Sequence, residues 1–262
     1  MNLHKLSPAI LTLLVFLLAQ GVGVPLLLIT GTTSVALFSL VLMGINILAV
    51  LACYFLLHNI RFTSAFDISS VRWWPGMLAI ASCIFGASSI AILTEKVELP
   101  QAMQEMSLAM SNDFCGLLAI VLIGPVTEEL LFREAIAGEM LRRGASPWTA
   151  IIVSALAFGT IHLNLAQGIY AFPIGILLGI IYYKTGGIVL TSLFHILNNG
   201  INAALLHIVG EDIADISYKE WFGGAGIAYT FMVLFAALCI LLIKLFWSHY
   251  QPCKKTTKSA SP

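Results

Sequence analysis

Two adjacent glutamates, Glu128 and Glu129, interrupt a long apolar stretch of the chain. A charged side chain in the hydrocarbon core of a bilayer costs at least about 2.5–3.5 kcal/mol, so ionisable groups inside apolar segments are functional candidates. His162 and His195 lie in two other apolar segments, and Asn199 follows four residues after His195. A carboxylate beside an imidazole can hold and deprotonate water, while an imidazole and a carboxamide can donate hydrogen bonds to an oxyanion. These groups together indicate hydrolysis of an amide bond.

Helical spacing assigns different surroundings to the two glutamates. Glu129 and Arg133 are four residues apart, so their side chains can form an ion pair on one helix face. Arg133 can then keep Glu129 anionic, and Glu128 lies about 100° away around the helix and faces elsewhere. We therefore expect Glu128 to be the catalytic base.

The depths of the polar groups in the membrane also agree. The turn around Ala145 joins two antiparallel segments, with Glu128 17 residues before it and His162 17 residues after it. At 1.5 Å per residue, both groups are expected ~21 Å from the inner boundary of the membrane. His195 and Asn199 are placed at roughly 10 and 16 Å by the same rise. The four groups are therefore predicted to lie in one layer.

Composition places the chain among membrane proteins. The sequence is 59% hydrophobic and only 10% charged, with a mean hydropathy of +0.96, whereas a soluble domain carries about 25% charged residues. The 13 basic and 13 acidic residues cancel, so no basic surface favours nucleic acid as a partner.

Eight apolar segments predict an all-α, polytopic transmembrane helix bundle of about eight spans. The segments are approximately residues 8–29, 35–57, 75–93, 114–141, 148–163, 167–183, 188–208 and 225–247. We expect a single transmembrane domain over residues 1–251, with a core at 114–208 that bears the polar groups. The basic, Ser/Thr-rich residues 252–262 are expected to form a disordered cytoplasmic tail. Gly175 and Gly179 form a GxxxG pattern that favours close helix packing.

Charge alternates between successive connections, which predicts the orientation. The basic residues of every second connection are Lys5, Arg61, Arg72, Arg142, Arg143, Lys184, Lys254, Lys255 and Lys258. The intervening connections are mainly acidic. By the positive-inside rule, both termini are expected in the cytoplasm. Glu139, Arg142 and Arg143 are interpreted as interface anchors, and Asn198 and Asn202 as groups that hydrogen-bond between packed helices.

Three short motifs occur in order on three predicted spans. They are EExxxR at Glu128, Glu129 and Arg133, FxxxH at Phe158 and His162, and HxxxN at His195 and Asn199. In these residues the chain resembles the CPBP family of intramembrane glutamic proteases, which includes the type II CAAX prenyl endopeptidases and the Abi and bacteriocin-processing proteins. The motifs cover residues 128–199, and the first three spans match only in hydropathy.

The resemblance implies an intramembrane glutamic endopeptidase that needs no metal or other cofactor. It also implies a role for each matching residue: Glu128 activates water with help from His162, His195 and Asn199 stabilise the oxyanion, Glu129 and Arg133 support the site, and Phe158 packs beside it. The expected partners are membrane lipid and a membrane-associated peptide or protein substrate. The family allows prenylated tails and bacteriocin or signalling-peptide precursors as substrates.

Two other functions remain open from the residues alone. Two histidines and two carboxylates can bind zinc, which would make the protein a membrane metalloprotease, although HExxH is absent. A Glu/His proton relay would instead fit a non-enzymatic transporter or membrane chaperone. For either enzyme, we expect a multi-pass protein of the bacterial cytoplasmic membrane whose active site opens toward the cytoplasm.

Overall fold

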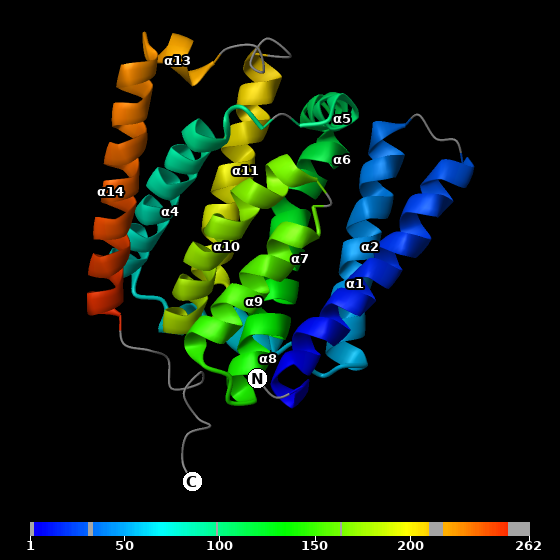
Figure 1. Ribbon diagram of the computed structural model, residues 1–262. Coiled ribbons are helices and arrows are strands. Elements are labelled where there is room, and N and C mark those ends of the chain that lie inside the picture. Colours follow the sequence, from blue (N-terminus) through cyan, green and yellow to red (C-terminus); the bar gives the residue numbers. More distant parts are fainter. Residues whose placement is uncertain (1–2, 31–33, 98, 163, 210–216, 251–262) are drawn as a thin grey trace.

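A computed structural model describes residues 3–30, 34–97, 99–162, 164–209 and 217–250 (Figure 1). Within these residues the protein is a helix bundle with no strand, as predicted. The helical elements are α1 (Leu3–Thr30), α2 (Val35–Phe55), α3 (Phe62–Ala65), η1 (Ile68–Ser70), α4 (Trp73–Thr94), α5 (Gln101–Ser111), α6 (Phe114–Leu117), η2 (Leu118–Ile123), α7 (Gly124–Glu129), η3 (Leu130–Gly138), α8 (Glu139–Arg142), α9 (Pro147–Thr160), α10 (Leu165–Thr185), α11 (Val189–Val209), α13 (Tyr218–Trp221) and α14 (Ala225–His249). The tail predicted at 252–262 lies outside the described residues.

Each of the eight predicted apolar segments coincides with a helical segment. Seven helices are long and apolar enough to cross a membrane, and the stretch from Phe114 to Arg142 counts as one of them. The eighth, α9, has only 14 residues, which span ~21 Å of the ~30 Å hydrocarbon core. The protein is therefore an integral multi-pass membrane protein, and α9 depends on its neighbours α10 and η3 for burial.

The basic connections meet at one end of the bundle. The Lys5 ammonium donates to the Gly144 carbonyl, 2.6 Å away, and Lys184 donates to the Tyr250 carbonyl at 2.9 Å. The start of α1 and the end of α14 consequently lie at the same end as the turn between α8 and α9 (Figure 1). At the opposite end, the backbone N–H of Tyr218 donates to Glu95. The geometry agrees with the predicted charge alternation, and the cytoplasmic assignment of the basic end stays a prediction.

Helices α9 and α10 pack closely through glycine. A Cβ on Gly175 would lie 3.1 Å from Ala155, and one on Gly179 would lie 3.0 Å from Ile151. Such distances leave no space for a larger side chain, which confirms the close packing predicted from the GxxxG pattern. This packing fixes α9, which carries Phe158, against α10.

The segment from Phe114 to Arg142 departs from a regular α-helix at two π-helical stretches, η2 and η3, on either side of α7. At the end of η2 the Gly124 N–H donates to the Ala119 carbonyl, five residues back. Pro125 follows and has no N–H to donate, which interrupts the α-helical ladder. Both glutamates therefore lie on a short α-helical piece between two widened stretches, an arrangement often found at functional sites.

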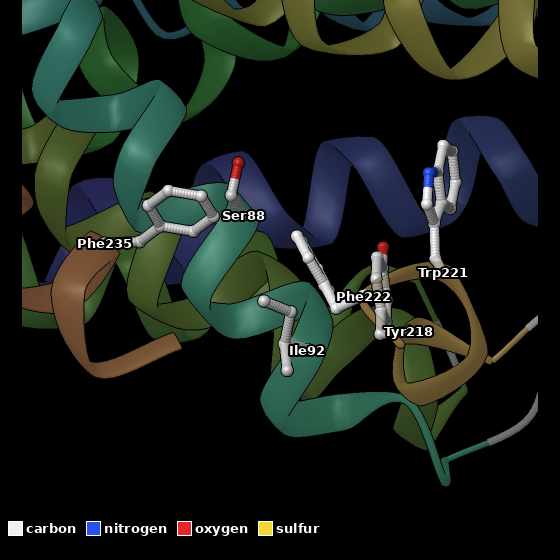
Figure 2. Close-up of a pocket in the computed structure, with 6 residues that line it drawn as sticks. All are labelled: Ser88, Ile92, Tyr218, Trp221, Phe222 and Phe235. Atoms are coloured by element: carbon white, nitrogen blue, oxygen red, sulfur yellow. The ribbon is translucent and has the colours of Figure 1, made fainter. Parts of the chain in front are cut away.

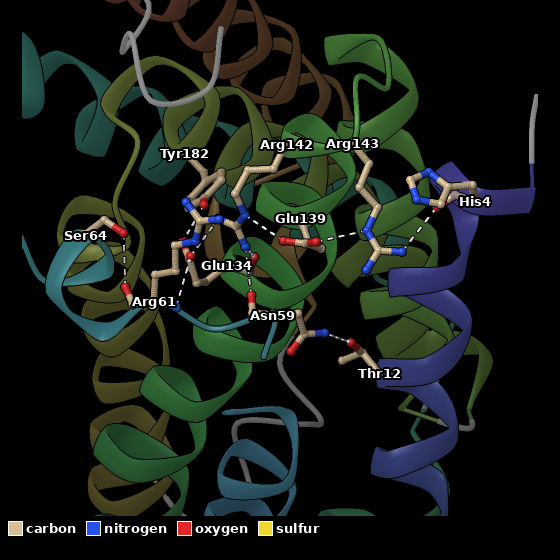
Figure 3. A network of polar contacts seen from close by, with 10 residues as sticks. All are labelled: His4, Thr12, Asn59, Arg61, Ser64, Glu134, Glu139, Arg142, Arg143 and Tyr182. Carbon is tan, nitrogen blue, oxygen red and sulfur yellow. Dashed lines mark hydrogen bonds and ion pairs between the residues drawn. The ribbon is translucent and has the colours of Figure 1, made fainter. Parts of the chain in front are cut away.

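A second polar cluster closes the basic end of the bundle (Figure 3). We call Glu134, Arg142, Tyr182 and Asn59 the Glu134 cluster. The buried Glu134 carboxylate accepts from the Tyr182 hydroxyl at 2.5 Å and from Arg142 at 2.8 Å, and Arg142 also donates to the Asn59 carbonyl at 2.8 Å. A Cβ on Gly138 would lie 2.2 Å from the Tyr182 hydroxyl oxygen, so glycine gives that hydroxyl its access. The cluster ties η3 to α8, α10 and the loop before α3.

We predict that Glu134→Ala lowers the unfolding temperature in detergent micelles. Removing one member of a buried ion pair leaves its partners unsatisfied, which costs about 3 kcal/mol or more. Tyr182→Phe removes one hydrogen bond to the same carboxylate and costs about 1–3 kcal/mol. Glu105→Ala, on the exposed face of α5, is the matched control. Equal unfolding temperatures for Glu134→Ala and Glu105→Ala would contradict the structural role of the cluster.

Candidate active site

The three motifs lie on neighbouring helices of the bundle. Glu128 and Glu129 end α7, and Arg133 follows in η3. His195 is a buried residue of α11, and Phe158 is a buried residue of α9. The fourth and seventh predicted spans therefore bring their polar groups together, and the fifth adds an aromatic ring.

Arg133 and Glu129 form the ion pair predicted from their spacing. The Arg133 Nη1 atom lies 3.2 Å from Glu129 Oε1, and both side chains are 0% exposed. The guanidinium also lies over the Phe158 ring, with its carbon 4.4 Å from the ring centroid. No nitrogen of Arg133 has a hydrogen-bond partner among the described residues. The buried cation is therefore held by the Glu129 charge and by the face of an aromatic ring, a contact worth about 2 kcal/mol when desolvated.

His195 lies between the two glutamates. Its Nδ1 atom is 3.1 Å from Glu129 Oε1, and its Nε2 atom is 3.7 Å from Glu128 Oε2. Although the two glutamates point in directions about 100° apart, the two nitrogens of one imidazole reach both carboxylates. The two carboxylates meet different nitrogens of the ring, and the expected separation of Glu128 from the Glu129–Arg133 face stays a prediction. An ionised carboxylate can only accept, so Nδ1 donates to Glu129, and Nε2 faces Glu128.

The two glutamates differ in accessibility. The Glu129 side chain is 0% exposed, whereas the Glu128 side chain is 21% exposed. Glu129 is paired with Arg133 and His195, whereas Glu128 makes one longer contact, with His195, within the described residues. Of the two carboxylates, Glu128 is the one that an incoming molecule can reach.

His162 lies just after the end of α9 and contacts the last turn of that helix. Its Nδ1 atom lies 2.9 Å from the Phe158 carbonyl oxygen. Because a carbonyl only accepts, Nδ1 carries the hydrogen. When the ring is neutral, Nε2 carries none and can accept a hydrogen bond. No hydrogen bond or ion pair joins His162 to Glu128 in the described part of the chain. The predicted assistance of Glu128 by His162 is therefore not a direct contact here and stays a prediction.

Phe158 stands between the two imidazoles. Its ring centroid is 5.3 Å from that of His162 and 5.7 Å from that of His195, and both pairs are edge-to-face. This geometry is favourable for aromatic pairs. Phe158 therefore contacts His162, His195 and Arg133 with one ring.

Asn199 contacts the widened helix rather than the glutamates. Its amide nitrogen donates to the Ile120 carbonyl of η2 at 2.9 Å. One of its two N–H groups is thus used, and no hydrogen bond from the other is found among the described residues. Asn198 accepts from the Tyr170 hydroxyl of α10, which fits its interpretation as a group that hydrogen-bonds between packed helices. It also donates to the Asn199 side-chain oxygen within α11, at 3.3 Å.

Sequence reasoning missed Ser154, which fixes the second π-helical stretch. Its buried hydroxyl donates to the Phe132 carbonyl at 2.6 Å. Phe132 directly precedes Arg133, so this bond from α9 helps to set where the guanidinium lies. A signal was present, because Ser154 lies four residues before Phe158 and therefore on the same face of α9.

Figure 2 shows an apolar pocket lined by residues outside the three motifs. It has a volume of about 190 Å³ and is lined by Ser88, Ile92, Tyr218, Trp221, Phe222 and Phe235. These residues come from α4, α13, the residue after α13, and α14, which carry none of the motifs. Tyr218 and Trp221 lie at the end of the bundle with the acidic connections, as expected of interfacial aromatics. The pocket therefore belongs to the membrane boundary and not to the candidate chemistry.

A metal site needs several ligating side chains that are grouped in space. Over the described ranges, no three His, Cys, Asp or Glu side chains are grouped to hold a metal ion. Glu129 Oε1, the oxygen nearest to His195 Nδ1, is also the atom paired with Arg133. A cation next to that oxygen would face the guanidinium charge.

The segment that bears the motifs matches a known protein family. Residues 110–201 match a family model described as type II CAAX prenyl endopeptidase Rce1-like. No curated protein and no solved structure matches the chain. The matched segment begins in α5 and ends in α11, so it contains all seven motif residues. The resemblance inferred from the motifs is therefore confirmed over this segment, which is similar to the Rce1-like CAAX proteases, a family of membrane peptidases.

Proposed function

We propose that the protein is an intramembrane glutamic endopeptidase that hydrolyses a peptide bond of a membrane-associated peptide or protein. The observation that carries the proposal is the position of His195 between an accessible Glu128 and a buried Glu129 that is paired with Arg133. The match of residues 110–201 to a peptidase family supports it.

In this mechanism Glu128 is the general base. It removes a proton from a water molecule, whose oxygen attacks the carbonyl carbon of the scissile bond to give a tetrahedral oxyanion. The 3.7 Å between Glu128 and His195 is longer than a direct hydrogen bond and suits a bridging oxygen. Collapse of the intermediate breaks the C–N bond, and Glu128 returns the proton to the leaving amine nitrogen. His162, with its free Nε2, assists at the accessible side of the site.

His195 and Asn199 stabilise the oxyanion. The Nδ1 proton of His195 is committed to Glu129, so donation to the oxyanion requires a second proton on Nε2. The free N–H of Asn199 supplies another donor. Glu129 and Arg133 orient His195 without touching the substrate. The mechanism thus gives the two glutamates separate tasks.

The basic end of the bundle faces the cytoplasm in this proposal, because the positive-inside rule assigns clustered Lys and Arg to that side. The location proposed is the bacterial cytoplasmic membrane, with the site opening toward the cytoplasm. The substrate class comprises prenylated tails and bacteriocin or signalling-peptide precursors. Mass spectrometry of membrane peptides from cells that express the protein or its Glu128→Gln variant separates these possibilities.

Cleavage should depend on Glu128 and on both histidines. Glu128→Gln, His162→Ala and His195→Ala should each lower the cleavage rate at least about 100-fold, because each removes a group that moves a proton or stabilises charge in the transition state. The readout is the accumulation of uncleaved membrane peptides in cells with equal amounts of folded protein. Glu105→Gln, on exposed α5, should behave as the unchanged protein. Full cleavage by Glu128→Gln would overturn the proposal, and equal peptide profiles with and without the active protein would favour a transporter or chaperone.

Glu129 should matter for stability and Glu128 for catalysis. Glu129→Gln leaves the fully buried Arg133 unpaired and should cost about 3–5 kcal/mol of stability. Adding Arg133→Met removes the unpaired charge and should restore the unfolding temperature but not cleavage. Glu128→Gln, by contrast, should unfold within a few degrees of the unchanged protein. A larger loss of stability in Glu128→Gln than in Glu129→Gln would contradict the assigned tasks.

Cleavage should not require a metal ion. Cleavage should continue in EDTA and in phenanthroline, because the proposed mechanism uses a carboxylate base and no Lewis acid. Inhibition by both chelators, with restoration by zinc and recovery of one metal ion per chain, would instead support a zinc enzyme.

A further inference from the structure

A chain of hydrogen bonds runs from α10 through α11 to η2. The Tyr170 hydroxyl donates to Asn198 Oδ1 at 3.0 Å. The Asn198 amide nitrogen donates to Asn199 Oδ1 at 3.3 Å, and the Asn199 amide nitrogen donates to the Ile120 carbonyl at 2.9 Å. Four groups from α10, α11 and η2 thus form one continuous chain that ends on the π-helical stretch before the glutamates.

The direction of this chain is fixed at its far end. The Ile120 carbonyl can only accept, so the NH₂ group of Asn199 must point to it. The oxygen of Asn199 then points to Asn198 and requires a donor there. Asn198 supplies its NH₂ group, which turns its own oxygen toward Tyr170. The Tyr170 hydroxyl completes the chain of hydrogen bonds, because it can donate to the Asn198 oxygen.

Removal of the hydroxyl would release the chain from its near end. Without a donor at its oxygen, the Asn198 amide keeps only its 3.3 Å bond to Asn199 and is held less firmly. The Ile120 carbonyl still sets which end of the Asn199 amide faces it. The hydroxyl of Tyr170 therefore acts through Asn198 on how firmly the Asn199 amide is held in that orientation.

We infer that Tyr170 is a positioning residue, which acts through Asn198 to hold the free N–H of Asn199 toward the substrate oxyanion. The inference rests on the proposed function for the role of Asn199. It adds Tyr170 and Asn198, which lie outside the three motifs. Tyr170 is on α10, which carries no motif residue. Tyr170 and Asn198 are both half-buried, and the hydrogen bond between them joins α10 to α11.

The direct test of the chain needs no substrate. Protein labelled with ¹⁵N at asparagine is recorded by NMR in micelles, and the side-chain signals of Asn198 and Asn199 are assigned by their Ala variants. Tyr170→Phe keeps the ring and should shift both signals. Tyr229→Phe, on the exposed face of α14 with 45% exposure, is the control and should shift neither. An unchanged Asn199 signal in Tyr170→Phe would overturn the inference.

The functional test uses an internally quenched, farnesylated CAAX peptide in micelles, together with the accumulating membrane peptides in cells. Tyr170→Phe should lower kcat roughly tenfold, the effect of about one hydrogen bond, with KM within twofold and an unfolding temperature close to that of Tyr229→Phe. Asn198→Asp keeps the acceptor for Tyr170 but loses the donor to Asn199, and should match Tyr170→Phe. In an Asn199→Ala background, Tyr170→Phe should cause no further loss.

The outcomes separate this inference from the proposed function. A second tenfold loss in the Asn199→Ala background would show that Tyr170 acts independently of Asn199 and would overturn the relay alone. Full cleavage by Asn199→Ala, with Glu128→Gln still inactive, would overturn both the relay's catalytic role and the proposed oxyanion donor. Full cleavage by Glu128→Gln would overturn the proposed function itself, while the NMR shifts would still decide whether the chain of hydrogen bonds exists.

Discussion

The buried pair of Glu129 and Arg133 is the interaction on which the rest of the site depends. A carboxylate and a guanidinium that are both 0% exposed each carry a desolvation cost that only mutual attraction offsets. The same carboxylate oxygen accepts from His195, and the same guanidinium lies over Phe158. One ion pair therefore fixes an imidazole on α11 and a ring on α9, and it leaves Glu128 as the accessible acid.

The helix that carries this pair is held by its neighbours at two widened stretches. Asn199 donates to a carbonyl of η2, and Ser154 donates to a carbonyl of η3. Below the site, the Glu134 cluster ties the end of η3 to α10 and to the loop before α3 (Figure 3). Side chains from three segments thus satisfy backbone and carboxylate groups of one helix, because a bilayer offers no water to satisfy them.

Much of this architecture followed from the sequence. Apolar runs long enough to cross a bilayer predicted the helices, and i,i+4 spacing predicted the Glu129–Arg133 pair, because both depend only on local geometry. The π-helical stretches were not predicted; their carbonyls accept hydrogen bonds from Asn199 and Ser154, which lie far along the chain. The place of His195 between both glutamates was missed because helix angles give the direction of a side chain but not the reach of an imidazole from another helix. Tyr170 was missed because it contacts the motifs only through Asn198.

The most direct test of the central claim is an experimental structure of the Glu128→Gln variant with a trapped uncleaved substrate. The account predicts that the scissile carbonyl carbon lies beside the side chain at position 128, with its oxygen within hydrogen-bond distance of His195 Nε2 and the Asn199 amide nitrogen. A substrate whose scissile bond lies away from these three groups, for example in the apolar pocket between α4, α13 and α14, would contradict it.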